Sequence, residues 1–186
     1  MYDGNNRLAI RSQRWLVSSL CELMEEIPYE KITIGQICGR ADLSRQTFYN
    51  LFGSKDEILR FGLRDAYEEC FRGLADKETL AADDVVKSFL DVVENTQALL
   101  DAIIKNDLGG ILSEEISRCV GMFAGRFVPT DEKDEMFPYM EALTAGALSG
   151  MLTFHLTKGE PADGEKLSGL LSDFLGGTFY GGLDLH

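Results

Sequence analysis

The chain has 186 residues, of which 45% are hydrophobic and 26% charged, and it contains only 4 prolines. This composition predicts a globular protein large enough to bury a core, and it excludes the disordered, collagen-like and fibrous classes. The longest run without a charged residue, 142–157, is 16 residues long, whereas a membrane-spanning helix needs about 20 mostly apolar residues. Because the N-terminus also shows no basic and apolar leader, we expect a cytoplasmic protein with no membrane partner.

The residue types that carry most catalytic and metal chemistry are sparse. The four cysteines lie far apart without a Cys-x-x-Cys pair, and the histidines are His155 and His186 alone, so we expect buried thiols and no metal site. The sequence shows no nucleophile elbow or phosphate loop, and Glu114 and Glu115 are adjacent, which places them on different faces of a helix. We therefore expect a protein that is not an enzyme and has no cofactor.

The charges are unevenly distributed along the chain. A formal net charge of −13 argues against nucleic acid as a partner, since affinity for phosphate comes from Lys and Arg. However, residues 1–60 contain eight acidic and eight basic residues, whereas 61–186 contain 23 acidic and 10 basic ones. Between Lys31 and Lys55, four basic residues stand against Asp42 alone. A short, locally basic segment is therefore embedded in an acidic chain.

Apolar residues recur with the helical period along nearly the whole chain, which predicts an all-α fold. Four helices are expected early in the chain, at about 8–27, 34–40, 45–52 and 54–74. Pro28 ends the first of them. Thr33 with Gln36 forms the capping-box pattern at the start of the second, Ser44 can cap the third, and Ser54 with Glu57 repeats the box at the start of the fourth.

Further helices are expected in the second part of the chain, at about 83–105, 111–127, 137–158 and 165–175. The first of these contains a candidate break near Asn95. Residues 75–79 and 128–134 are expected to be loops. The glycine pairs at 109–110, 176–177 and 181–182 are interpreted as helix stops and a loose tail.

The second and third helices have the helix-turn-helix arrangement, in which the second helix of the pair enters a DNA major groove. Small or apolar side chains occupy the positions that a compact three-helix core would bury: Ile34, Ile37, Cys38, Ala41, Leu43 and Phe48. The outward positions carry Arg45, Gln46, Thr47, Tyr49 and Asn50. Arginine suits guanine, Gln and Asn suit adenine, and hydroxyl groups suit base edges or phosphates.

The stretch ITIGQICGRADLSRQTFYNLF at 32–52, followed by SKDEIL at 54–59, resembles the DNA-binding domain of the TetR family of bacterial transcriptional regulators. The resemblance covers about residues 8–65. It implies an N-terminal three-helix helix-turn-helix domain, residues 1–60, followed by a helical ligand-binding and dimerisation bundle, residues 61–186. Asp42 stands at a turn position where the family commonly has glycine, and Asp tolerates a left-handed backbone better than most residues.

The resemblance also implies roles for individual residues. Thr47, Tyr49 and Lys55 match phosphate contacts, and Arg45, Gln46 and Asn50 match base-reading positions. The capping residues Thr33 and Ser44 complete the predicted DNA-binding set. Lys55 begins a helix whose N-terminal amides also attract phosphate. The alternative interpretation is that Arg45 and Lys55 are solvated surface charges and Tyr49 is a half-buried core residue.

The body of the chain carries two further predicted sites. A glycine within a helix is about 1 kcal/mol less favourable than an alanine. Close approach of another helix would explain why this helix contains both Gly146 and Gly150. The resemblance implies that they form a homodimer interface with Leu167, Leu171 and Phe174, and the alternative is packing within the chain. Candidates for lining an effector cavity, each of which could instead be ordinary core, are Phe89, Cys119, Met122, Phe123, Tyr139, Phe154 and His155.

Together these patterns predict a DNA-binding transcriptional regulator. We expect a repressor that a small-molecule effector, not identified by the sequence, releases from an inverted-repeat operator in double-stranded DNA. The alternative is a helical interaction or scaffold protein whose helix-turn-helix no longer binds DNA.

Overall fold

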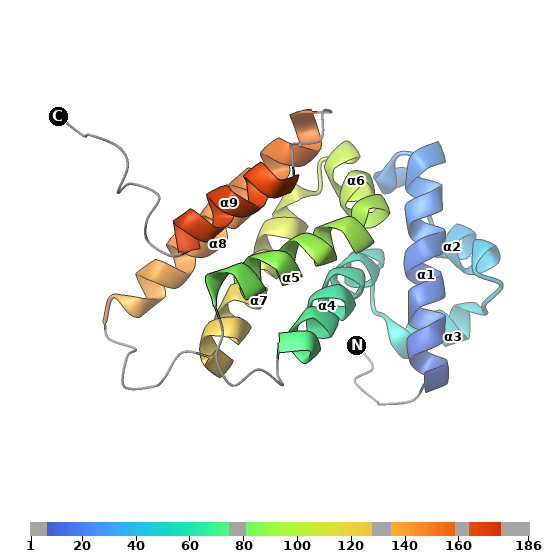
Figure 1. Cartoon of the computed structure of the whole chain (residues 1–186). Coiled ribbons are helices and arrows are strands. Elements are labelled where there is room, and N and C mark those ends of the chain that lie inside the picture. The colour runs from blue at the N-terminus through green and yellow to red at the C-terminus, as the bar shows by residue number, and fades with distance from the viewer. Residues whose placement is uncertain (1–6, 75–80, 128–134, 159–163, 176–186) are drawn as a thin grey trace.

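The computed structural model describes residues 7–74, 81–127, 135–158 and 164–175. In this part of the chain the regular elements are all helices, which confirms the predicted all-α fold (Figure 1). None of the helices described there combines the length and the apolar character that crossing a membrane requires.

Three helices form a compact head at one end of the molecule: α1 (Arg7–Glu26), α2 (Ile34–Arg40) and α3 (Arg45–Leu51). A short 3-10 helix, η1 (Tyr29–Lys31), connects α1 to α2. The apolar faces of these helices meet in one core, in which Leu16, Ile37 and Phe48 are completely inaccessible to solvent. Burying a side chain of this size contributes about 1.5–3 kcal/mol, so the spacing of the apolar residues fixes how the three helices pack.

The starts of α2 and α3 follow the predicted capping patterns. The backbone N–H of Gln36 donates to Thr33 Oγ1 at 3.3 Å, and the backbone N–H of Thr33 donates to Gln36 Oε1 at 2.9 Å. These two hydrogen bonds confirm the capping box of α2. Ser44 caps α3 by accepting from Thr47 N at 3.0 Å.

The capping box predicted at the start of α4 (Lys55–Leu74) is only half correct. Ser54 Oγ accepts from Glu57 N at 3.3 Å, as expected. The Glu57 carboxylate, however, reaches one residue further back and accepts from Gly53 N at 2.9 Å. It therefore ties the loop before the helix to the first turn instead of closing the box on Ser54.

The body contains α5 (Ala82–Asn95), α6 (Gln97–Lys105), α7 (Gly109–Phe127), α8 (Phe137–Lys158) and α9 (Gly164–Leu175). The break expected near Asn95 separates α5 from α6.

The interpretation of the glycine pair 109–110 as a stop was wrong, because this pair begins α7. The preceding turn is made by Asp107, which has a φ of 58°. The pairs 176–177 and 181–182 and the loops expected at 75–79 and 128–134 lie outside the described residues.

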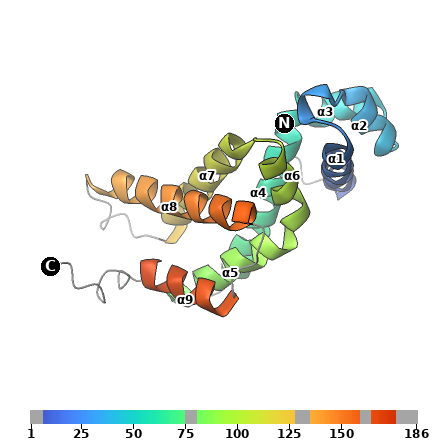
Figure 2. The same ribbon diagram turned by 90° about the horizontal axis from the view of Figure 1, so that it is seen from above.

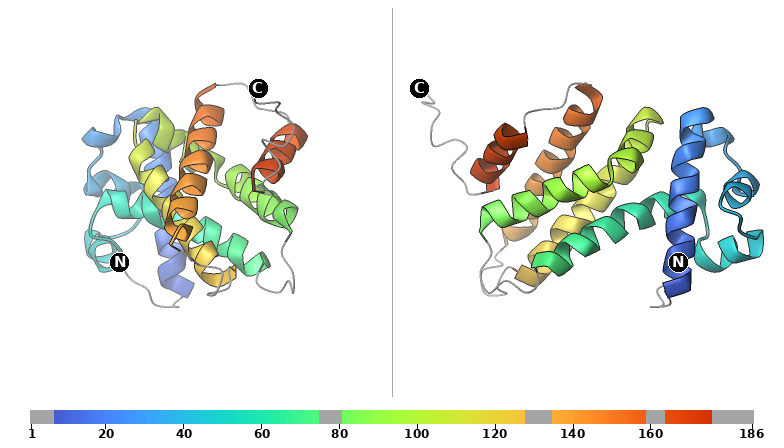
Figure 3. Two further views of the ribbon diagram at one scale, coloured as in Figure 1. Left: turned by 90° about the vertical axis from the view of Figure 1, so that its left-hand side faces the viewer. Right: turned by 45° about the vertical axis from the view of Figure 1, so that its right-hand side comes forward.

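Helix α4 runs from the head into the body, where it packs against α5 and α7. Helix α8 packs on α7, and α9 packs on α5. The head and the α8 and α9 pair therefore lie at opposite ends of the molecule (Figures 2 and 3). The boundary expected at residue 60 falls within α4, which is shared by the two parts.

The head and the body meet closely at Gly62 of α4. A Cβ atom at this position would lie 2.8 Å from Leu99 Cδ2 of α6 and 3.0 Å from Val17 Cγ1 of α1. The absence of a side chain therefore lets α1 and α6 close over α4. The head is therefore in direct contact with the body at this point.

Candidate functional site

The turn between α2 and α3 depends on a left-handed residue. Asp42 has a φ of 52°, in the region that most residues other than glycine avoid. Leu43 N then donates to Cys38 O at 2.9 Å and closes the end of α2. The expectation that Asp42 takes this conformation is confirmed, and the turn directs α3 across α2.

The polar side chains predicted on α3 form one outward face. Arg45, Gln46, Tyr49 and Asn50 are exposed, and Thr47 is half-buried beside the Ser44 cap. Gln46 Nε2 donates to Asn50 Oδ1 at 3.0 Å, so these two amide side chains are held together one turn apart.

Tyr49 is 59% exposed, and its ring lies nearly perpendicular to that of Phe48 at a centroid distance of 5.3 Å. It is therefore more exposed than the half-buried core residue that was the alternative interpretation. Its ring and hydroxyl are available on the same side of the head as the polar face of α3.

The guanidinium of Arg45 lies against the first turn of α2. A Cβ atom on Gly35 would lie 2.6 Å from Arg45 Nη2, so a larger residue there would shift the flexible end of the Arg45 side chain. No role for Gly35 was predicted from the sequence. The signal that identifies it is a glycine in the first turn of a helix, where a bulkier residue would normally be tolerated.

Lys55 takes a different position from the one expected of a solvent-facing phosphate contact. Its ammonium group lies 4.0 Å from the centroid of the Tyr29 ring, and it donates to the carbonyl oxygens of Tyr29 and Ile32. The Tyr29 hydroxyl in turn donates to Asp56, and burial together with this hydrogen bond raises the pKa of Tyr29. Lys55 therefore fixes η1 to the start of α4.

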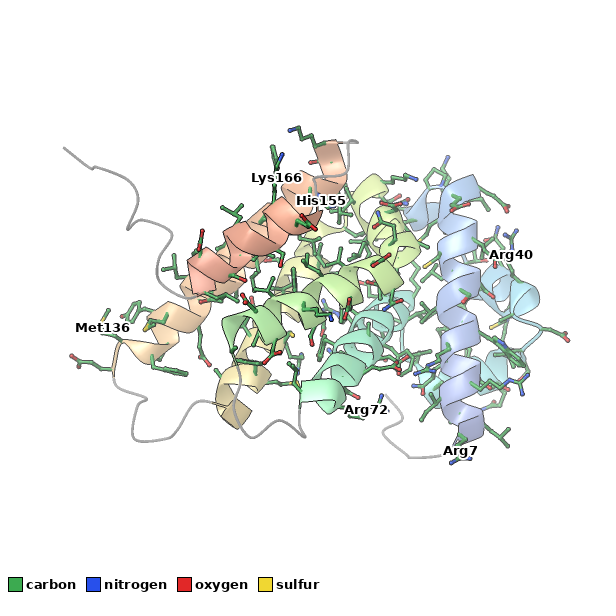
Figure 4. All side chains as sticks on the ribbon, in the orientation of Figure 1. Arg7, Arg40, Arg72, Met136, His155 and Lys166 are labelled. Atoms are coloured by element: carbon green, nitrogen blue, oxygen red, sulfur yellow. The ribbon has the colours of Figure 1, made fainter. Side chains whose placement is uncertain are left out.

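The charges of the basic segment are partly neutralised within the head. Arg40, labelled in Figure 4, donates to Glu26 at 2.7 and 3.0 Å and lies 3.6 Å from Glu22. Lys31 and Arg45 are exposed. The positive charge that remains available to a polyanion is therefore concentrated at η1 and at the start of α3.

A cavity of about 660 Å³ lies in the body and is lined by residues from α4 to α9. Phe89, Cys119 and Phe123 line it, as predicted. The cavity assignments of Met122, Tyr139, Phe154 and His155 were wrong.

Met122, Tyr139 and Phe154 are 45%, 69% and 64% exposed, and His155 is not among the lining residues. Helix α8 turns a different face inward, which carries Phe137, Glu141, Thr144, Leu148 and Leu152.

The cavity wall contains a buried carboxylate that was not predicted from the sequence. Glu115 is 2% exposed and accepts from Arg64 Nε and Nη2, both at 2.7 Å, and from Arg60 Nη1 at 3.2 Å. Burial alone would raise the pKa of Glu115, but the hydrogen bonds from Arg64 and Arg60 outweigh it and hold that pKa below its usual range. The signal that was available is the pair Arg60 and Arg64, one turn apart on α4.

The neighbouring Glu114 shows that the two carboxylates do point to different faces. Its side chain is 65% exposed and lies 2.6 Å from Arg60 Nη2. Arg60 therefore bridges a surface carboxylate and a buried one, and it ties the start of α7 to α4.

The outer face of α8 is apolar and exposed. No heavy atom of the described residues lies within 4 Å of a Cβ built at Gly146 or Gly150, apart from those of their own helix and chain neighbours. Tyr139, Leu143 and Phe154 are also exposed along this face. Neither glycine is therefore used for packing within the described part of the chain.

The predicted interface residues of α9 divide between two environments. Leu171 is 4% exposed and lines the cavity, so it packs within the chain and not on an outer face. Leu167 and Phe174 are half-buried.

In the described part of the chain, no group of three or more His, Cys, Asp and Glu side chains is placed to hold a metal ion.

Comparisons with known proteins agree with this geometry. Residues 16–60 match the family model of the bacterial regulatory proteins of the tetR family. No curated protein matches the sequence. Lin0861 from Listeria innocua has a similar structure, with a TM-score of 0.74 at 15% identity and coverage of 94% of each chain.

Two further solved structures are similar over most of their length. One is described as a TetR-family transcriptional regulator from Syntrophomonas wolfei, with a TM-score of 0.61 at 16% identity and coverage of 95% of this chain and 98% of the other. The other is the dihydroxyacetone kinase operon activator DhaS, with a TM-score of 0.60 at 16% identity and coverage of 92% and 96%. At these identities the likeness establishes the fold alone. At residues 16–60 the head therefore carries the N-terminal domain of the bacterial regulatory proteins of the tetR family.

Proposed function

We propose that the protein is a cytoplasmic, homodimeric transcriptional repressor that a small molecule releases from an inverted-repeat DNA operator. Residues 1–60 would bind the operator, and residues 61–186 would form the dimer and hold the effector. The observation that carries this proposal is the exposed polar face of α3, presented by a left-handed turn at Asp42 in a domain of the tetR family.

DNA binding is tested on the outward face of α3. Gel-shift titrations against genomic fragments should show a salt-sensitive complex. Gln46→Ala should relax base preference by about 1–3 kcal/mol for each lost contact. Arg45→Ala should weaken the specific complex, whereas Lys105→Ala, which removes an exposed cation at the end of α6, should have no effect.

Failure of the wild-type protein to shift any fragment would refute operator binding. It would favour the alternative of a helical interaction protein. Lys55→Ala is less decisive than Arg45→Ala, because it also removes the hydrogen bonds to the Tyr29 and Ile32 carbonyls.

The exposed apolar face of α8 supports the homodimer. One short recognition helix reads few base pairs, and two-fold symmetry doubles the site. Gly150→Glu places a charge on this face, and sedimentation velocity should then show monomers. Ser18→Glu adds the same charge on the exposed surface of α1 and should leave the dimer intact. A wild-type monomer, or a dimer that tolerates Gly150→Glu, would contradict this interface.

The cavity supports the effector part of the proposal. Its volume of about 660 Å³ lies within the range of about 300–1,000 Å³ that ligand sites occupy. An effector bound there shifts DNA affinity only through its different affinity for two states, typically by about 1–3 kcal/mol. A change in the tilt of α4, which joins head and body, would alter the separation of the two recognition helices.

The direction of regulation is measured by transcription from the bound promoter in vitro. We expect transcript to fall when the protein is added and to recover with effector. DhaS, one of the structurally similar proteins, is an operon activator. A rise in transcript when the protein is added would contradict the proposed repressor role and indicate an activator. Equal effector affinity with and without operator would contradict the release mechanism.

A further inference from the structure

The cavity in the body is apolar along most of its wall. Its aliphatic lining comes from six helices, α4 to α9, and aromatic rings are contributed by Phe89, Phe123 and Phe137. Among the described residues that line it, the charged ones are Glu115 and Glu141, and none is a lysine, arginine or histidine. The charge that a ligand meets there is therefore negative.

Glu115 is already fully engaged by protein cations. Both of its oxygens accept from Arg64, Oε1 also accepts from Arg60, and Arg118 Nε lies 3.6 Å from Oε2. A ligand could reach it only by breaking a buried ion pair, which costs several kcal/mol. Glu115 is therefore part of the wall and not the group that a ligand neutralises.

Glu141 is in the opposite situation. It lies half-buried on the inward face of α8, one turn before Thr144, which also lines the cavity. Among the described residues neither side chain has an ion-pair or hydrogen-bond partner. A carboxylate beside an apolar wall is stabilised when a positive charge approaches it, because partial burial has already removed part of its hydration.

The same cavity disfavours other classes of ligand. A carboxylate or phosphate ligand would lose its hydration without gaining a counter-charge from the described wall, and it would be repelled by Glu141. A sugar would find few partners for its hydroxyl groups. An apolar cation has neither cost, and the faces of aromatic rings attract cations further.

We propose that the effector is a lipophilic organic cation, with its apolar part in the cavity and its positive charge beside Glu141. This inference rests on the proposed function, in which the cavity is the effector site. It assigns the class of the ligand and the residue that selects it.

The test uses the full-length protein without DNA and a matched series of probes. Decyltrimethylammonium, decanol and decanoate share one alkyl chain and differ in the charge of the head. Isothermal titration calorimetry, below the concentrations at which micelles form, gives the affinity of each. We expect the cation to bind at least about tenfold more tightly than decanol, and decanoate to bind more weakly than decanol.

Two variants connect the selectivity to one residue. Glu141→Gln should reduce the affinity for decyltrimethylammonium by about tenfold and leave decanol unchanged. Glu94→Gln removes one carboxylate from the exposed surface of α5, changes the net charge equally, and should leave all three affinities unchanged. A melting curve for each variant confirms that it is folded.

Each of the other outcomes overturns the inference. These are equal or tighter binding of decanoate, no binding of any probe, or a cation preference that survives Glu141→Gln. None of them affects the operator titrations, which test the proposed function separately. A protein that binds the cation but no DNA would retain the assigned ligand class and lose the regulatory role.

Discussion

The ion pair between Glu115 and Arg64 should hold α7 against α4 more strongly than a surface ion pair would. The carboxylate is 2% exposed and the Arg64 side chain 20% exposed, and two N···O distances of 2.7 Å join them. Removing one partner of a buried pair typically costs about 3–5 kcal/mol. Because Arg64 retains some contact with water, we expect Glu115→Ala to lower the free energy of unfolding by about 3 kcal/mol.

A double-mutant cycle in urea separates the ion pair from the loss of packing. Glu115→Ala, Arg64→Ala and the double variant should give a coupling energy of about 1.5–3 kcal/mol. The matched reference is the pair Arg14 and Asp65, also joined at 2.7 Å but with Arg14 52% exposed, for which about 0.2–1 kcal/mol is expected. A coupling energy for Glu115 and Arg64 no larger than that of the reference would refute the reasoning.

The dependence of stability on pH gives an independent measure of the same ion pair. The pKa of Glu115 is lowered in the folded protein, so its ionised form stabilises the fold above the unfolded pKa of about 4.3. This contribution is lost as the pH falls through the folded pKa. Wild-type protein should therefore lose more stability than Glu115→Ala on acidification below about pH 4.3, and identical losses would contradict an ionised, paired carboxylate.

Two further substitutions test the head and its junction with the body. Asp42→Gly should raise the free energy of unfolding by about 0.5–1 kcal/mol, since Asp42 holds a φ of 52° that glycine adopts without strain; a lower melting temperature would contradict this. Asn106→Ala should cost about 1–3 kcal/mol, because Asn106 Oδ1 accepts from Tyr29 N at 3.0 Å. Asn95→Ala, at the exposed end of α5, is its control in denaturant unfolding, and equal stabilities would show that the Tyr29 N–H loses nothing.

The head could be predicted from the sequence because its signals are local. Thr33 and Gln36 are three residues apart, Ser44 and Thr47 likewise, and Asp42 lies in a turn of fixed length. Each of these contacts is determined within a few residues of chain, and the apolar spacing marks the face that each of the three helices buries. Of the predicted capping patterns, only that of α4 differs in the structure, where Glu57 reaches Gly53.

The body was less predictable because α8 has apolar residues on all sides. Helical periodicity identifies an apolar face only where a polar face opposes it. Tyr139 and Phe154 were therefore assigned to the cavity, whereas they lie on the outer face, and Glu141 was passed over although it lies on the inner one.

The sequence does not show which residues far apart in the chain contact each other. Lys55 binds carbonyl groups 26 and 23 residues before it, and Glu115 binds arginines 55 and 51 residues before it. In each case the residue type was consistent with a solvated surface charge. The tertiary arrangement alone turns Lys55 toward η1 and buries Glu115 in the cavity wall.

Contacts of this kind connect the cavity, through α6, to the junction of α1, η1 and α4. Leu100 of α6 lines the cavity, and Asn106, which caps the same short helix, also donates to Met24 O at 3.4 Å and accepts from Tyr29 N. The Tyr29 carbonyl binds Lys55 at the first turn of α4. Because the nine residues of α6 form one continuous helix, in a closely packed interior that transmits strain, we expect a ligand that displaces Leu100 to displace Asn106 as well. The junction where α1, η1 and α4 meet would then shift with it.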